Sequence, residues 1–122
     1  MEKGLDVRGM DATEISRKME KYVADYFKGY SLGEGESMFM EGHLFRLEEI
    51  SDMLPKKYLT LFNDGAEFIT MSGFINVGEA NERVISVVMD EQSNYVYLLL
   101  MHETDENGEE KGIVIKDFLS GT

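Results

Sequence analysis

The residues best suited to chemistry lie in one short stretch, MHETDENGEEKG at residues 101–112, which holds five carboxylates and one histidine. Oxygen ligands at alternate positions, here Asp105, Asn107 and Glu109, are typical of calcium-binding loops. A tight hairpin, however, directs alternate side chains away from a common centre, and the terminal bidentate glutamate of a calcium loop is missing. The pattern therefore favours a solvated hairpin tip over a metal site.

Histidine is the second ligand type to consider. His102, with Glu103 beside it or with His43 if the fold joins the two, has the chemistry that zinc accepts. Two histidines alone make a poor zinc set, and the absence of cysteine excludes thiolate metal sites, disulfides and cysteine nucleophiles. We expect neither a metal nor a cofactor, and a histidine hydrogen-bonded to a neighbour is the simpler interpretation.

Motifs of common enzyme families are missing from the sequence. It contains no GxGxxG, GxxxxGK[ST], GxSxG or HExxH pattern. Ser72 precedes a glycine in TMSGF, but no strand-to-helix elbow surrounds it and neither histidine stands in a recognisable partner context. We expect a protein without catalytic activity.

Charge is the strongest global feature of the chain. The net charge is −12, and residues 58–122 hold 3 basic and 12 acidic groups, against 9 and 12 in residues 1–57. Such a chain repels phosphate backbones and is suited to a basic protein surface. We therefore expect a protein partner and no direct binding of nucleic acid.

The sequence predicts a small acidic protein-binding module of the inhibitor or immunity type, directed against a basic nuclease or DNA-binding effector. Its carboxylates would occupy the basic site of that partner in place of nucleic-acid phosphates. Aromatic side chains near a glycine-rich loop would anchor the complex. The predicted acidic patch is Glu103, Asp105, Glu106, Glu109, Glu110, Glu79, Glu82, Asp90 and Glu91. The predicted aromatic anchors are Tyr30, Phe39 and Phe45.

Two other classes of function stay open. One is a small-molecule-binding or enzyme-accessory domain with a pocket between the first helix and the sheet, recognisable by an apolar hollow with a few convergent polar groups. The other is a structural subunit that self-associates, for example as a homodimer, through a sheet edge or an apolar face.

Local patterns predict the elements that position these residues. Apolar residues at spacings of three and four predict a helix over residues 11–28, with Asp11 and Glu14 as a capping box and Gly29 at the C′ position. Shorter helical pieces follow in EEISDML and KKYLTLFND. The strand-like segments EFITM, FINV, RVISVVM, NYVYLLLM and GIVIKDF occupy residues 67–118. The fold class is therefore α+β, with helices packed on a mainly antiparallel sheet that ends in a meander.

The acidic stretch also sets an expected strand register. Asn107-Gly108 predicts a two-residue type I′ turn, in which both residues have positive φ. Counting outward from it pairs His102 with Ile113, Leu100 with Ile115, and Tyr97 with Phe118. The preceding segment, residues 95–101, is apolar on both faces, which predicts a central strand covered on both sides.

Length and hydropathy indicate the number of domains and the cellular location. A chain of 122 residues with 43% hydrophobic content is expected to form one domain, residues 1–122, with residues 1–9 disordered or a short strand. The longest apolar run, YVYLLLM, is far below the roughly 20 residues that cross a membrane, and the start lacks the apolar core of a signal peptide. We expect a cytoplasmic protein with no membrane partner.

Two segments resemble parts of known families. LDVRGMDATE, residues 5–14, resembles the strand-to-helix entry of the small sulfur-relay carriers, but Ala12 and Thr13 replace the Cys-Pro pair that sulfur transfer requires. LPKKYLTLFNDG, with NYVYLLL and KDFL, resembles pieces of the SUKH superfamily of immunity proteins. The helix after LP is about one turn shorter than in that family, and the first 47 residues have no counterpart. Neither resemblance is specific enough to assign a family.

Overall fold

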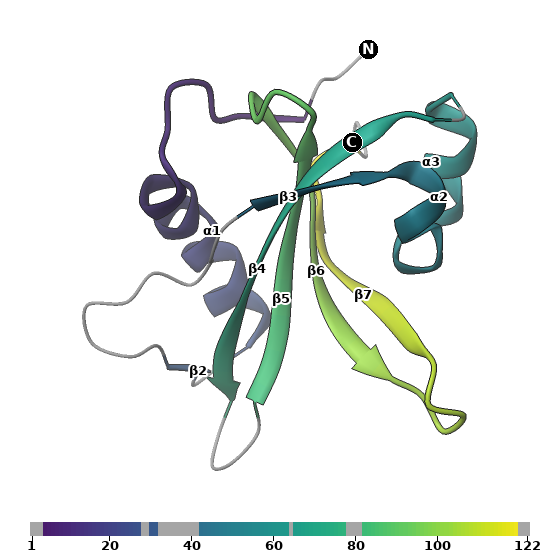
Figure 1. Ribbon diagram of the computed structural model, residues 1–122. Coiled ribbons are helices and arrows are strands. Elements are labelled where there is room, and N and C mark those ends of the chain that lie inside the picture. Colours follow the sequence, from purple (N-terminus) through teal and green to yellow (C-terminus); the bar gives the residue numbers. More distant parts are fainter. Residues whose placement is uncertain (1–3, 28–29, 32–41, 64, 78–81, 120–122) are drawn as a thin grey trace.

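Seven strands form one sheet in the computed structural model, which describes residues 4–27, 30–31, 42–63, 65–77 and 82–119 (Figure 1). Every pairing among the described strands is antiparallel. The strands are β1 (Leu5–Asp6), β2 (Tyr30–Ser31), β3 (Gly42–Arg46), β4 (Glu67–Val77), β5 (Glu82–Asp90), β6 (Tyr95–Thr104) and β7 (Glu110–Asp117).

The last four strands form the predicted meander, and the short strands complete its edges. β4, β5, β6 and β7 pair in sequence order. The short strands β2 and β3 pair with the two ends of β4, while β1 pairs with the start of β6. As a result, β4, β5 and β6 are the interior strands of the sheet, with β5 in the middle.

One face of the sheet is covered by α1 (Ala12–Tyr26). Its capping box forms as predicted, since the amide of Glu14 donates to Asp11 Oδ1 at 2.8 Å and the amide of Asp11 donates to Glu14 Oε1 at 3.5 Å. The apolar side of this helix packs on residues of β4, β5 and β6 in one buried cluster. The helix has its C-cap at Phe27, and Gly29 lies outside the described residues.

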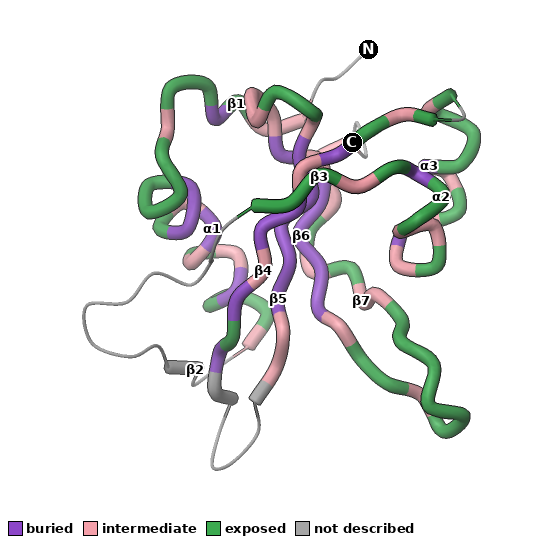
Figure 2. Tube along the Cα trace, viewed as in Figure 1, coloured by how far each residue is buried: buried purple, intermediate pink, exposed green. Residues whose placement is uncertain are grey.

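The opposite face is covered by a second helical region: α2 (Leu47–Ile50), the 3-10 turn η1 (Ser51–Met53) and α3 (Lys56–Leu61). Tyr58 is fully buried there, and its hydroxyl donates to Asp117 Oδ1 and to the carbonyl of Tyr97. The molecule therefore has three layers, and the middle of the sheet is its most buried part (Figure 2). The prediction that NYVYLLLM is covered on both sides is confirmed by the burial of Val96, Leu98, Leu99, Leu100 and Met101.

Two expectations about the strands are wrong in detail. EFITM and FINV are one continuous strand, because β4 runs through Ser72 and Gly73 while pairing with β5. The β6–β7 tip is a three-residue loop in which only Gly108 has positive φ. The amide of Gly108 donates to the carbonyl of Asp105, and that of Asp105 donates to the carbonyl of Glu109, as in a type I turn followed by a bulge.

This loop shifts the register near the tip by one residue. His102 pairs with Gly112 and Leu100 pairs with Val114, in place of Ile113 and Ile115. A bulge between Leu99 and Leu100 restores the predicted register farther down. There the amide of Phe118 donates to the carbonyl of Tyr97, the pair that the sequence predicts.

No helix in the described part of the chain is both long and apolar enough to cross a membrane.

Candidate functional site

The acidic stretch forms one wall of a groove, and α2 with the turn η1 forms the other. Gly112 of β7 lies directly under the backbone of Met53, and a β-carbon at Gly112 would overlap the carbonyl group of Met53. This close approach holds the end of η1 against the hairpin. Beyond it the two elements diverge and leave a groove of about 800 Å³ that is open to solvent. In Figure 1 this region lies between α2 and the outer end of β7.

Four carboxylates line this groove, two from each wall. Its lining residues are Glu49, Asp52, Met53, Glu109, Glu110, Lys111 and Gly112. The carboxylates are exposed, and within the described ranges no salt bridge joins any of the four to a cation. The single lysine has its Nζ 3.3 Å from Asp105 Oδ2, so its charge is already offset. We call the carboxylates Glu49, Asp52, Glu109 and Glu110 the groove acids.

Asp105 shapes the hairpin tip and faces its own turn. Its Oδ1 accepts hydrogen bonds from the amides of Asn107 at 2.9 Å and Glu109 at 3.0 Å. Hydrogen bonds from the amides of Glu109 and Asn107, together with the nearby ammonium of Lys111, lower the pKa of the Asp105 carboxyl below its ordinary value. Of the calcium ligands considered above, Asp105 is thus bonded to the backbone amides of the other two, Asn107 and Glu109. Among the described residues, no group of three acidic or histidine side chains is placed to hold a metal ion.

Asp90 and Glu91 lie at the other end of β6 from the hairpin tip. A ten-residue strand separates the two ends, which corresponds to roughly 30 Å. Asp90 Oδ1 accepts hydrogen bonds from the amides of Asn94 at 2.6 Å and Tyr95 at 2.7 Å, so this carboxylate caps the β5–β6 turn. The predicted acidic patch is thus divided between two ends of the sheet.

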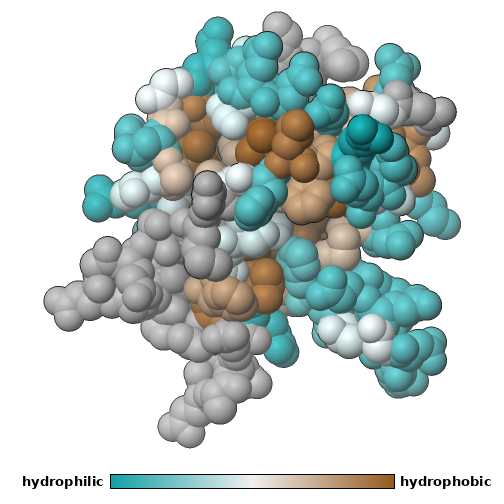
Figure 3. Space-filling model, viewed as in Figure 1, coloured by the Kyte–Doolittle hydropathy of each residue, from teal (hydrophilic) through white to brown (hydrophobic). Residues whose placement is uncertain are grey.

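The remaining predicted residues are only partly described. Glu79 and Phe39 lie outside the described residues, and only the backbone of Glu82 and Tyr30 is described. Glu103 and Glu106 are exposed on the hairpin, but they do not line the groove. The tip as a whole is strongly hydrophilic, as the teal arm at the lower right of Figure 3 shows. Phe45 is half-buried, and its ring forms part of a second hollow.

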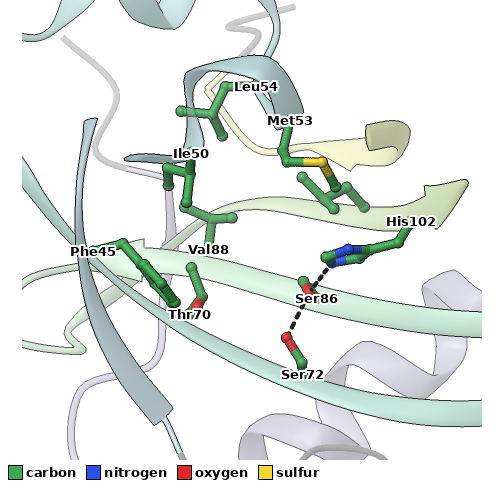
Figure 4. A pocket seen from close by; sticks show the side chains of 10 residues that line it. Phe45, Ile50, Met53, Leu54, Thr70, Ser72, Ser86, Val88 and His102 are labelled. Atoms are coloured by element: carbon green, nitrogen blue, oxygen red, sulfur yellow. Dashed lines mark hydrogen bonds between the residues drawn. The ribbon is translucent and has the colours of Figure 1, made fainter. Parts of the chain in front are cut away.

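That second hollow is an apolar pocket of about 110 Å³ between η1 and the sheet (Figure 4). Apolar side chains from α2, η1, β3 and the sheet form most of it. Its lining residues are Phe45, Ile50, Met53, Leu54, Thr70, Ser72, Ser86, Val88, Leu100 and His102. Met53 lines both this pocket and the acidic groove. We call this hollow the Ser-His pocket.

A chain of hydrogen bonds crosses three strands on the floor of the Ser-His pocket. Ser72 Oγ of β4 lies 2.6 Å from Ser86 Oγ of β5, which lies 2.5 Å from His102 Nε2 of β6 (Figure 4). Burial lowers the pKa of His102, and the Glu110 carboxylate offsets part of this shift, so the ring is neutral near pH 7. A neutral imidazole can either accept a hydrogen bond from the Ser86 hydroxyl or donate one to it, according to its tautomer.

His102 and His43, considered above as a zinc pair, do not come together. His43 lies exposed on β3, and the strands β4 and β5 separate it from β6. His102 Nε2 is within hydrogen-bonding distance of Ser86, as the interpretation of a hydrogen-bonded histidine predicts.

Sequence reasoning missed two features of these sites. Glu49 and Asp52 were not predicted as part of the acidic patch, because they reach the hairpin only through the contact of η1 with Gly112. The hydrogen bonds that join Ser72, Ser86 and His102 depend on the register of three strands. Strand alternation places each of them on one face, but only the register brings them together.

Comparison with known proteins assigns no family to this chain. No protein-family model matches it, and searches of curated proteins and solved structures return no match either. Function is therefore inferred from the geometry and chemistry of the sites.

Proposed function

We propose that this protein is a binding module that docks the acidic groove onto a basic surface of a protein partner and blocks that surface. The observation that carries the proposal is the groove itself, which Glu49 and Asp52 line from one wall and Glu109 and Glu110 from the other, without a compensating salt bridge in the described part of the chain. A basic side chain that enters between the walls gains attraction from both sides.

The partner class follows from the sign of these charges and from their placement on two walls. Two rows of carboxylates across a groove present negative charge much as two phosphate rows do. A nuclease or DNA-binding effector carries basic residues that are arranged to meet such rows. The proposed activity is therefore inhibition or immunity, in the cytoplasm, by occupying the nucleic-acid site of this partner.

Charge of this kind mainly governs how fast and how selectively partners meet, and apolar contacts add affinity. Val114, on the outer strand β7, is 38% exposed and lies two residues from Gly112 at the groove. It offers an apolar contact beside the groove acids.

The proposal is tested by capture from a lysate of the source organism at low salt, followed by elution with a salt gradient. The wild-type protein is compared with a groove variant, Glu109→Gln with Glu110→Gln, and with a control variant, Glu67→Gln with Glu91→Gln. Both variants remove two carboxylates, but those of the control lie outside the groove.

We expect wild type and control to retain the same basic nucleic-acid-handling protein, and the groove variant to release it at lower salt. If all three proteins release it at the same salt concentration, the groove is not the binding surface. If no such protein is retained by the wild type, the proposed function is wrong.

A further inference from the structure

Apart from the proposed partner-binding role of the groove, the Ser-His pocket has the features of a ligand site. It adjoins the groove, because Met53 lines both, but none of the groove acids lines it. Binding sites for small molecules combine apolar walls with a few polar groups that converge at one place. Here the walls come from α2, η1 and β3, and the polar groups come from β4, β5 and β6 (Figure 4).

The size of the pocket limits its ligand to about one six-membered ring. Apolar cavities of about 150 Å³ bind benzene. This pocket measures about 110 Å³ and is open to solvent on one side, so a ring can enter without complete enclosure. Phe45 and Met53 in its wall favour an aromatic ring, because ring edges and thioether sulfur both attract one.

The charge of the pocket selects a neutral ligand. None of its lining residues is an aspartate, glutamate, lysine or arginine, and His102 is neutral near pH 7. A charged ligand would lose its hydration in a mainly apolar site and gain no counter-charge there.

The hydrogen-bonded chain selects a hydroxyl group on that ligand. Ser86 serves as the middle member, between Ser72 Oγ and His102 Nε2. Ser72 is the end member, so its hydroxyl keeps capacity to donate or accept, according to the direction of the chain. A ligand hydroxyl can do both and matches either direction, whereas a carbonyl matches only one.

The place of Ser86 within the sheet favours binding over acyl transfer by this serine. Ser86 lies in the central strand β5, which pairs with β4 on one side and β6 on the other. Its backbone amide therefore serves the sheet and cannot form part of an oxyanion hole.

We propose that the Ser-His pocket binds a neutral phenol, with the ring between Phe45 and Met53 and the hydroxyl against Ser72. Two sources of this chemistry exist, a free phenolic molecule or the side chain of a tyrosine. The inference does not depend on the proposed partner, since the pocket and its test involve this chain alone.

The test is a titration of the isotope-labelled protein with p-cresol, followed by amide chemical shifts. Toluene is the matched ligand without a hydroxyl group, and N-acetyltyrosinamide represents a tyrosine within a peptide. The variant Ser72→Ala removes the hydroxyl at the end of the Ser72–Ser86–His102 series of hydrogen bonds. The variant Ser51→Ala is the matched control, since its hydroxyl bonds the carbonyl of Glu48 outside the pocket.

We expect saturable shifts at the pocket strands with p-cresol, binding at least about tenfold weaker with toluene, and a similar loss in Ser72→Ala but not in Ser51→Ala. Binding of N-acetyltyrosinamide as well would assign the site to a tyrosine side chain, and binding of p-cresol alone to a free phenol. Equal binding of p-cresol and toluene, no binding of p-cresol, or unchanged p-cresol binding in Ser72→Ala would overturn the inference.

Discussion

The α-carbon of Gly112 on β7 lies against the carbonyl group of Met53 at the end of η1, with no room for a side chain between them. This contact joins the helical layer to the β6–β7 hairpin. It fixes the angle between the walls of the acidic groove and one edge of the Ser-His pocket. Both candidate sites therefore depend on a single glycine.

Replacement of this glycine should loosen that contact. In Gly112→Ala the added methyl group meets backbone atoms, which cannot rotate away, so η1 must shift. We expect a loss of about 1–3 kcal/mol in the free energy of unfolding, measured by urea denaturation. Lys111→Ala is a control at the neighbouring position, where loss of the exposed ion pair with Asp105 should change the stability less than Gly112→Ala does. Equal stability of Gly112→Ala and wild type would contradict the contact.

The hydroxyl group of Tyr58 should stabilise the fold. It is buried and bonds Asp117 and the carbonyl of Tyr97, which links α3 to the ends of β6 and β7. Tyr58→Phe removes this donor, while the amides of Phe118 and Leu119 still donate to the two acceptors, so we expect it to cost about 1 kcal/mol in urea denaturation. Tyr22→Phe is the control, since the Tyr22 ring packs edge-on against Phe118 and that contact is kept. A cost for Tyr58→Phe no larger than for Tyr22→Phe would contradict this role.

The carboxylate of Asp105 should order the hairpin tip. In Asp105→Asn one side-chain oxygen can still accept from the amides of Asn107 and Glu109, whereas Asp105→Ala loses that acceptor. We expect faster hydrogen exchange at those two amides in Asp105→Ala than in Asp105→Asn. Because these contacts lower the pKa of Asp105, its contribution is present above its ordinary pKa of 3.8 and is lost as pH falls through the native value. Identical hydrogen exchange of the Asn107 and Glu109 amides in the two variants would contradict this role of the Asp105 side chain.

His102 should make the stability of the wild type sensitive to mild acid. Burial lowers its pKa below the ordinary value of 6.5, so the unfolded chain binds a proton more readily than the native state. The stability is thus complete above about pH 7 and declines as pH falls from 6.5 through the native pKa.

The variant His102→Gln isolates this effect, because glutamine can bond Ser86 but does not titrate in this range. We compare urea denaturation of both proteins at about pH 7.5 and about pH 5. The wild type should lose more stability than the variant between the two values, and other groups contribute equally to both proteins. An equal loss of stability in the two proteins would show that folding does not lower the pKa of His102.

The elements that were predicted correctly depend on local patterns. The apolar spacing and the Asp11–Glu14 capping box place α1, and the doubly apolar segment at residues 95–101 identifies a central strand. These signals lie within one element and need no knowledge of its neighbours. The fold class follows from their order along the chain.

The features that sequence reasoning missed depend on how elements meet. Asn107-Gly108 is compatible with more than one turn, and the type with a single positive φ shifted the register of Leu100 and His102 by one residue. The Ser-His pocket and the groove wall formed by Glu49 and Asp52 arise from strand register and from one backbone contact at Gly112. No single segment carries a signal for either.

The central claim is that the groove acids occupy a nucleic-acid site of a basic partner. It is tested most directly by competition, in which short duplex DNA is added to the captured complex and the released protein is measured. If the account is correct, DNA displaces the wild-type protein in proportion to its concentration, and displaces the variant Glu109→Gln with Glu110→Gln at a lower DNA concentration. If DNA and this protein bind the partner at the same time, the groove does not occupy the nucleic-acid site and the account is wrong.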